Sequence, residues 1–157
     1  QNIPAVKRVR FWMTFGEAYL EHLTALRNVG LTGTEPIDFQ GQQIVPLQFL
    51  KAVLPEPSTL GPRYTGHTCI ATILEGTKDG QPKKIIIYNI CDHKAAYKEV
   101  GVQAISYTTG VPAITAAQQV LSGAWQQPGV FCPEQLDPDP FLADLAKNGL
   151  PWHLTEL

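Results

Sequence analysis

A chain of 157 residues with 44% hydrophobic and 17% charged residues is long enough for one domain with a substantial core. Its net charge of −2 gives no electrostatic basis for binding nucleic acid or an anionic membrane. The sequence has no apolar run near the ~20 residues of a membrane helix, no signal segment and no metal-type spacing among Cys69, Cys91 and Cys132. We therefore expect a cytoplasmic protein with free thiols, whose partners are small molecules or proteins.

The first third of the chain predicts several short elements. The expected elements are a strand at residues 7–15 (KRVRFWMTF), a helix at 17–29, a hairpin at 35–45, a brief helix at 47–54 and a proline-rich loop at 55–66. Because a strand opens the chain directly, and the first residue is Gln1 instead of methionine, we expect a domain excised from a longer protein.

The strongest strand signals are residues 68–77 and 83–91, which the Asp79-Gly80 pair is expected to join as a hairpin. Neither face of these two strands alternates to polar residues, so the sheet needs cover on both sides. The pattern predicts an α+β fold with some α/β character: helices cover one face of the sheet, and the second face is available for dimerisation. A core built on both faces within one chain is the alternative.

Residues 103–123 form the centre of the chain. The sequence predicts a polar turn at residues 106–110 and an amphipathic helix that begins at Pro112. The alternative is a helix that already runs from about residue 102 and is only kinked at Pro112. Before this stretch we expect a helix at 94–100. After it we expect a strand at 129–132 and a helix at 140–147 begun by Asp139.

Two groups of residues are candidates for a binding site. Asp92 and His93 follow a strand, where ligands often meet the sheet in α/β proteins, although Asp92 would equally serve as a helix cap. Thr108, Thr109 and Gly110 would offer hydroxyl and backbone N–H donors to a carboxylate or phosphate if a helix starts just after them. The turn and the strand end are therefore the predicted site.

Several catalytic motifs are missing from the sequence. The four histidines are scattered, and there is no His-Glu-x-x-His, Cys-x-x-Cys, Gly-x-Ser-x-Gly or strand-to-helix Gly-x-Gly-x-x-Gly pattern. We therefore expect no metal site, no serine nucleophile and no complete dinucleotide-binding fold in this chain.

Four separated segments are distinctive when they are taken together: FWMTFGEAYLEHL, IVPLQFLKAVLPEPSTLGPR, YNICDHKAAYKEVG and QAISYTTGVPAITAA. In this order, and over nearly the whole chain, they resemble the carboxynorspermidine dehydrogenases within the saccharopine dehydrogenase family. The resemblance implies an NADP-binding Rossmann domain, absent from this chain, and a substrate and dimerisation domain with a mixed sheet, which residues 1–157 would form. It also implies a homodimer.

The activity that the resemblance implies is reduction, with NADPH, of the imine of aspartate semialdehyde and a diamine. The products would be carboxynorspermidine or carboxyspermidine; a saccharopine-type dehydrogenase of lysine metabolism and a non-catalytic dimerisation or binding module are the alternatives. An isolated fragment would be inactive, because the cofactor is bound mainly by the absent domain.

The implied substrate joins a carboxylate to a cationic amine, so its pocket needs donors at one end and acceptors at the other. Arg10 is expected to bind the carboxylate, with help from Thr108, Thr109 and Gly110, and Asp92 is expected to bind the amine. Either His93 or Tyr107 would move a proton. The alternative for Arg10 is a surface ion pair with Glu17.

Overall fold

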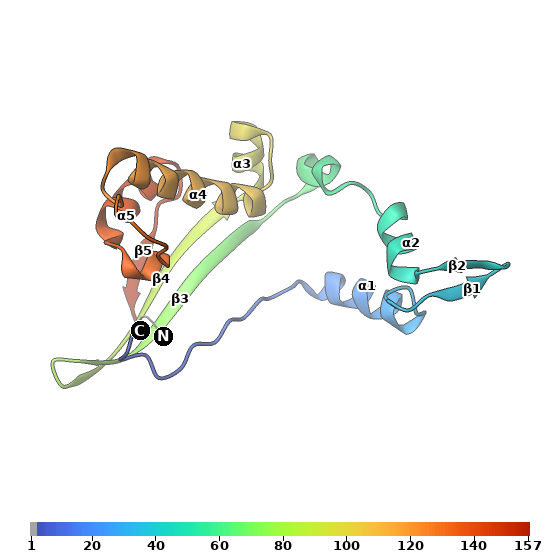
Figure 1. Cartoon of the computed structure of the whole chain (residues 1–157), viewed down its shortest axis with the longest axis horizontal. Helices are drawn as coiled ribbons and strands as arrows, with labels where there is room; N and C mark the ends of the chain where they lie inside the picture. Colours follow the sequence, from blue (N-terminus) through green and yellow to red (C-terminus); the bar gives the residue numbers. More distant parts are fainter. Residues whose placement is uncertain (1–2) are drawn as a thin grey trace. The chain divides into compact units, whose positions relative to one another are not determined.

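The computed structural model describes residues 3–157 and shows two compact units. One unit is Pro4–Glu56, and the other is Pro57–Leu157 with Ile3. Figure 1 shows the elements of both, and each unit is described by itself below. Both contain helices and antiparallel strands, which confirms the α+β class.

The Pro4–Glu56 unit contains two helices and one small hairpin. Its elements are α1 (Glu17–Asn28), β1 (Ile37–Phe39), β2 (Gln42–Ile44) and α2 (Pro46–Val53), close to the predicted positions. Glu17 in the first turn of α1 and Arg27 in the last turn both complement the helix dipole. The hairpin turns at Gln40 and Gly41, which both have positive φ.

The strand predicted at residues 7–15 is wrong. These residues are exposed and belong to no strand, and the side chains of Val9 and Phe11 are 84% and 83% exposed. A strand is defined by hydrogen bonds to a neighbour, so a β-type sequence without a paired neighbour forms none. The helix that follows, α1, has no buried residue either.

The second unit is built on a three-stranded antiparallel sheet. Its strands are β3 (His67–Lys78), β4 (Gln81–Asp92) and β5 (His153–Glu156), in the order β3-β4-β5. The predicted hairpin is confirmed: Asp79 and Gly80 have φ of 54° and 77°, as the two central residues of a type I′ turn require. All its strand pairs are antiparallel, whereas the resemblance implied a mixed sheet.

Three helices, α3 (His93–Val100), α4 (Ala104–Ser122) and α5 (Pro138–Lys147), lie on one side of this sheet (Figure 1). There are also two 3-10 helices: η1 (Pro57–Arg63) lies in the segment predicted as a loop, and η2 (Pro133–Gln135) follows the residues predicted as a short strand. The core between sheet and helices is small: Cys91, Ala96, Ala104, Tyr107, Leu145 and Leu150. The strand predicted at residues 129–132 is wrong, and α5 begins at Pro138 with Asp137 as its cap instead of at Pro140 with Asp139.

Helix α4 corrects the main prediction for the centre of the chain. It starts at Ala104, continues through Pro112 and ends where Gly123 adopts a left-handed conformation. The alternative, a helix already formed before Pro112, is therefore the correct one. Proline in a helix removes one i to i−4 hydrogen bond, and here the burial of Ala104 and Tyr107 against the sheet outweighs that loss.

Candidate functional site

The end of β4 and the start of α3 place Asp92 and His93 next to each other in the chain, with different partners. The carboxylate of Asp92 caps α3, because Oδ1 accepts the N–H of Ala95 at 2.7 Å. Its other oxygen lies 3.5 Å from Nε2 of His67, the residue paired with Asp92 across the sheet. The capping role proposed from sequence is confirmed, and the role of Asp92 as an amine ligand stays a prediction.

His93 is buried at the junction of three segments. Its Nδ1 accepts the N–H of Ala104 at 3.2 Å, so the ring satisfies the first backbone donor of α4. Its ring stacks on Tyr64 at 5.3 Å, and its own backbone N–H donates to the carbonyl of Gly66 at 3.0 Å. Since Nδ1 acts as an acceptor, the neutral ring carries its proton on Nε2.

The hydroxyl of Tyr107 lies in the core instead of in a turn. It donates to Oε1 of Glu99 at 3.0 Å, and the carbonyl oxygen of Asn148 lies 3.5 Å away. Burial raises the pKa of Tyr107, and the hydrogen bond and negative charge of Glu99 raise it further. A Cβ at Gly149 would come within 2.2 Å of this hydroxyl, so glycine is required there by close approach as well as by its φ of +94°.

Thr108, Thr109 and Gly110 lie inside α4 and not at its start. The hydroxyls of Thr108 and Thr109 both donate to the carbonyl of Ile105, at 3.2 Å and 2.8 Å. The prediction that these three residues present free helix-start N–H groups is therefore wrong, because the start has moved to Ala104. Thr108 is buried, whereas Thr109 and Gly110 are exposed, and a Cβ at Gly110 would meet nothing within 4 Å.

Arg10 belongs to the Pro4–Glu56 unit. Its side chain is exposed, in the extended segment before α1. An exposed guanidinium can form a bidentate pair with a carboxylate, and its role as a ligand stays a prediction.

Sequence reasoning missed the groups that hold the candidate residues in place. Tyr64, Glu99, Ala104 and Gly149 each contact His93 or Tyr107. Glu99 and Tyr107 lie on different helices, so no helical spacing in the sequence could have linked them. The only usable signal was Gly149, because a glycine after a predicted helix marks a positive φ.

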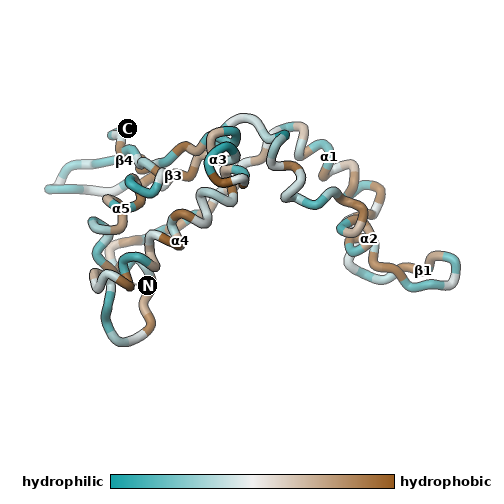
Figure 2. Tube along the Cα trace, turned by 90° about the horizontal axis from the view of Figure 1, so that it is seen from above, coloured by the Kyte–Doolittle hydropathy of each residue, from teal (hydrophilic) through white to brown (hydrophobic). Residues whose placement is uncertain are grey.

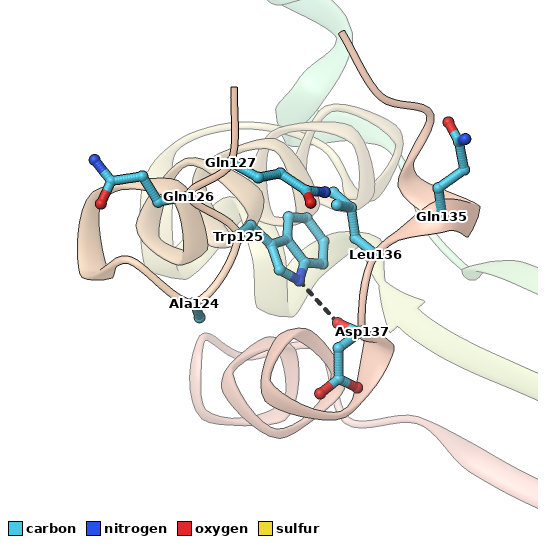
Figure 3. Close-up of a pocket in the computed structure, with 7 residues that line it drawn as sticks. All are labelled: Ala124, Trp125, Gln126, Gln127, Gln135, Leu136 and Asp137. Atoms are coloured by element: carbon cyan, nitrogen blue, oxygen red, sulfur yellow. Dashed lines mark hydrogen bonds between the residues drawn. The ribbon is translucent and has the colours of Figure 1, made fainter. Parts of the chain in front are cut away.

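A small cavity of about 200 Å³ lies beyond the end of α4. Trp125 forms one wall, stacks on Phe141 at 5.4 Å and donates from Nε1 to the carbonyl oxygen of Asp137 at 2.8 Å (Figure 3). The carboxamides of Gln126 and Gln135 point away from the ring, so the polar groups do not converge. The cavity is also smaller than most ligand pockets, and none of the predicted site residues lines it.

Within residues 3–157, no group of three or more His, Cys, Asp or Glu side chains is placed to hold a metal ion. Within the same residues, no helix has the length and apolar character needed to cross a membrane.

Comparison with known proteins places the chain in a family. The model of the saccharopine dehydrogenase C-terminal domain matches residues 1–150. The carboxyaminopropylagmatine dehydrogenase of Synechocystis sp. is 58% identical over 153 residues, which are 98% of this chain and 38% of that protein. The carboxynorspermidine synthases of Vibrio alginolyticus and Vibrio cholerae are each 53% identical over 156 residues, 99% of this chain and 37% of theirs.

The chain thus spans little more than a third of the length of these curated relatives. The match covers nearly the whole chain, including the β3–β4 hairpin and helix α4. The chain therefore belongs to the saccharopine dehydrogenase family, as its C-terminal domain.

Proposed function

We propose that this chain is the substrate-binding part of an NADPH-dependent reductase of polyamine biosynthesis. Its substrate would be the imine of aspartate semialdehyde and a primary amine. The observation that carries the proposal is identity of 53–58%, over nearly the whole chain, to proteins named for carboxyaminopropylagmatine and carboxynorspermidine.

The two names describe one chemistry applied to different amines. A carboxyaminopropyl group is what aspartate semialdehyde leaves on an amine after imine formation and reduction. The amine would be agmatine in one case and 1,3-diaminopropane in the other, with putrescine the corresponding choice for carboxyspermidine. Reduction adds a hydride to the imine carbon and a proton to its nitrogen, and bound NADPH would supply the hydride.

In this proposal the cofactor is bound mainly by a part of the protein outside this chain. Gly110 leaves the backbone of α4 accessible to another molecule, because nothing lies within 4 Å of the position that a Cβ would take there. Thr109 presents a methyl and a hydroxyl next to it on the exposed surface. We assign Thr109 and Gly110 to pack against the substrate, with Thr108 buried beneath them.

Asp92 is the proposed ligand of the cationic amine, because one of its oxygens is free of the helix cap and its side chain is 38% exposed. His93 is the better placed of the two candidates for proton transfer, since the hydroxyl proton of Tyr107 is directed at Glu99. Its Nε2 is the nitrogen not used by the backbone.

The first test is NADPH consumption by the uninterrupted gene product with aspartate semialdehyde and, in separate arms, agmatine, 1,3-diaminopropane or putrescine. We expect turnover only when both the aldehyde and an amine are present, and the preferred amine names the product. Turnover with glutamate and the aldehyde derived from lysine instead would support a saccharopine-type enzyme, which family membership favours as the second candidate. Folded protein without turnover in any arm would indicate a non-catalytic module.

Arg10 provides a test of the site. Arg10→Ala in the same protein should raise KM for the amino-aldehyde by about 10-fold or more, because a charge-assisted pair with a carboxylate is lost. Arg8→Ala, in the same exposed segment, is the matched control and should change KM little. Equal kinetics for the two variants would remove Arg10 from the site.

We also propose that the protein is cytoplasmic and homodimeric. Cys69, Cys91 and Cys132 are all free thiols, which supports a reducing compartment.

A further inference from the structure

Residues 61–66, which we call the strap, run from the end of η1 to the start of β3 and contact the first turn of α3. The carbonyl oxygen of Gly66 accepts the backbone N–H of His93 at 3.0 Å. The ring of Tyr64 stacks on the ring of His93, with the centroids 5.3 Å apart and the planes inclined by 26°. The strap therefore holds both the backbone and the ring of His93.

A further contact sets how closely the strap lies on α3. Gly61 is buried, and a Cβ there would lie 2.9 Å from Cε2 of Tyr97, so close approach requires glycine at this position. Tyr97 is four residues after His93 and shares its face of the helix. The tube of α3 carries both hydrophilic and hydrophobic colours in Figure 2, so the contact depends on particular rings and not on a continuous apolar face.

The ring of His93 is restrained in two different ways. The N–H of Ala104 donates to Nδ1 at 3.2 Å and fixes one point on the edge of the ring. A single hydrogen bond lets the ring rock about that point, whereas a stacked neighbour restricts the tilt of the ring plane. The edge contact and the face contact together leave one direction for Nε2.

We propose that Tyr64 is a positioning residue, whose ring holds the imidazole of His93 with Nε2 in one direction. The consequence for catalysis rests on the proposed function, in which His93 transfers a proton. Proton transfer requires the donor within hydrogen-bond reach of the acceptor, so its rate depends on the direction of Nε2. The contact is made by the face of the Tyr64 ring, so phenylalanine should be able to replace tyrosine there.

The first test is the kinetics of the uninterrupted gene product with NADPH, aspartate semialdehyde and its preferred amine. We expect Tyr64→Leu to lower kcat about 10-fold or more with KM changed less than about twofold, because the orientation of a proton donor affects the chemical step and not substrate binding. The solvent isotope effect on kcat in heavy water should rise, because proton transfer becomes the slow step. Tyr64→Phe keeps the ring and should restore kcat to within about twofold of the wild type.

Tyr88→Leu is the matched control. Tyr88 also lies 5.3 Å from a histidine ring, that of His153, but this pair joins β4 and β5 and does not touch α3. Its loss of an aromatic side chain should leave both kcat and the isotope effect near the wild-type values. Equal losses of kcat in Tyr64→Leu and Tyr88→Leu, or an unchanged kcat in folded Tyr64→Leu, would overturn the proposal.

A second measurement does not depend on activity. Diethyl pyrocarbonate acylates accessible imidazole nitrogens, and mass spectrometry of the digested protein gives the rate at each histidine. His93 is 8% exposed, and we expect it to react severalfold faster in Tyr64→Leu than in the wild type or in Tyr64→Phe, with the exposed His67 as internal reference. A wild type without turnover would refute the proposed function alone. Equal rates at His93 in all three proteins would overturn the role of Tyr64.

Circular dichroism and a cooperative thermal transition confirm that each variant is folded. If Tyr64→Leu fails to fold, Gly61→Ala displaces the strap and keeps both rings, because the new Cβ would meet the ring of Tyr97. We expect this variant to lower kcat about threefold or more and to raise the rate of acylation at His93. Wild-type values for both in folded Gly61→Ala would also overturn the proposal.

Discussion

At the scale of single residues, His93 shows how one buried ring can organise a site. Its Nδ1 accepts the N–H of Ala104, a residue with no exposed surface, and its ring stacks on Tyr64. A buried backbone donor without an acceptor costs about 1–3 kcal/mol, so this contact fixes where α4 begins. The exposed Thr109 and Gly110 are positioned by the same helix.

Two substitutions separate this structural role from proton transfer. His93→Asn keeps an acceptor near the position of Nδ1, whereas His93→Gln places its polar group near Nε2. We expect His93→Gln to lower the free energy of unfolding by about 1–3 kcal/mol more than His93→Asn, because only the former leaves Ala104 unpaired. Chemical denaturation measures the difference.

Activity of the same two variants in the complete protein gives the second readout. Retention of most of kcat by His93→Asn would assign His93 to positioning α4. Loss of kcat in both variants, with melting temperatures near the wild type, would assign it to proton transfer.

At the scale of elements, the contact between α4 and α5 depends on polar side chains. Thr115, with no exposed surface, accepts from Nδ2 of Asn148 at 2.9 Å and donates to the carbonyl of Val111 at 2.8 Å. Gln119 is 2% exposed and donates to Asp144 at 2.8 Å. Such a network holds the register of the two helices only while every member is paired.

Thr115→Val tests this network. We expect it to destabilise the protein by about 1–3 kcal/mol, because Asn148 loses an acceptor in a buried contact. Thr109→Val is the matched control: Thr109 makes the same i−4 hydrogen bond at 2.8 Å but is exposed, so the expected loss is below about 0.5 kcal/mol. Similar unfolding midpoints for the two variants would contradict a buried role for Thr115.

Asp144 makes the same contact dependent on pH. Hydrogen bonds from Lys147 and Gln119 hold the pKa of this carboxyl below its ordinary 3.8. A lowered pKa in the folded state means that the stabilisation is present above about pH 4 and is lost as the pH falls through the folded value. Asp144→Asn should therefore be less stable than the wild type at pH 7, and the difference in melting temperature between the two proteins should become smaller in acid. A difference of constant size in thermal melts between pH 7 and pH 3 would refute this.

At the scale of the whole molecule, large apolar surfaces are exposed in each unit. In the Pro4–Glu56 unit, Val9, Phe11 and Trp12 are 77–84% exposed and α1 buries nothing. In the other unit, Ile114 and Leu121 on α4 are 62% and 87% exposed. Surfaces of this kind are normally covered, and the chain spans only 37–38% of the length of its relatives.

Local pattern was a good guide wherever a short segment decides its own structure. The Asp79-Gly80 turn, the amphipathic stripe of α1 and the β-branched runs of β3 and β4 all lie where the sequence predicted them. Residues 7–15 have an equally good strand pattern and form no strand, because a strand also requires a neighbour that no pattern supplies. Pro112 predicted the start of a helix, but α4 continues through it, because packing of α4 on the sheet stabilises the helix more than the proline destabilises it.

The sequence by itself determined the α+β class, the central hairpin with its two apolar faces and the family of the chain. These three features depend on residue periodicity and on matched segments, and both can be recognised from the order of residues along the chain. Only the tertiary structure decided that His93 supports the start of α4 and that the hydroxyl of Tyr107 is directed at Glu99. The physical reason is that a buried polar group takes whichever partner packing brings to it, and those partners are 11 and 8 residues away, on other elements.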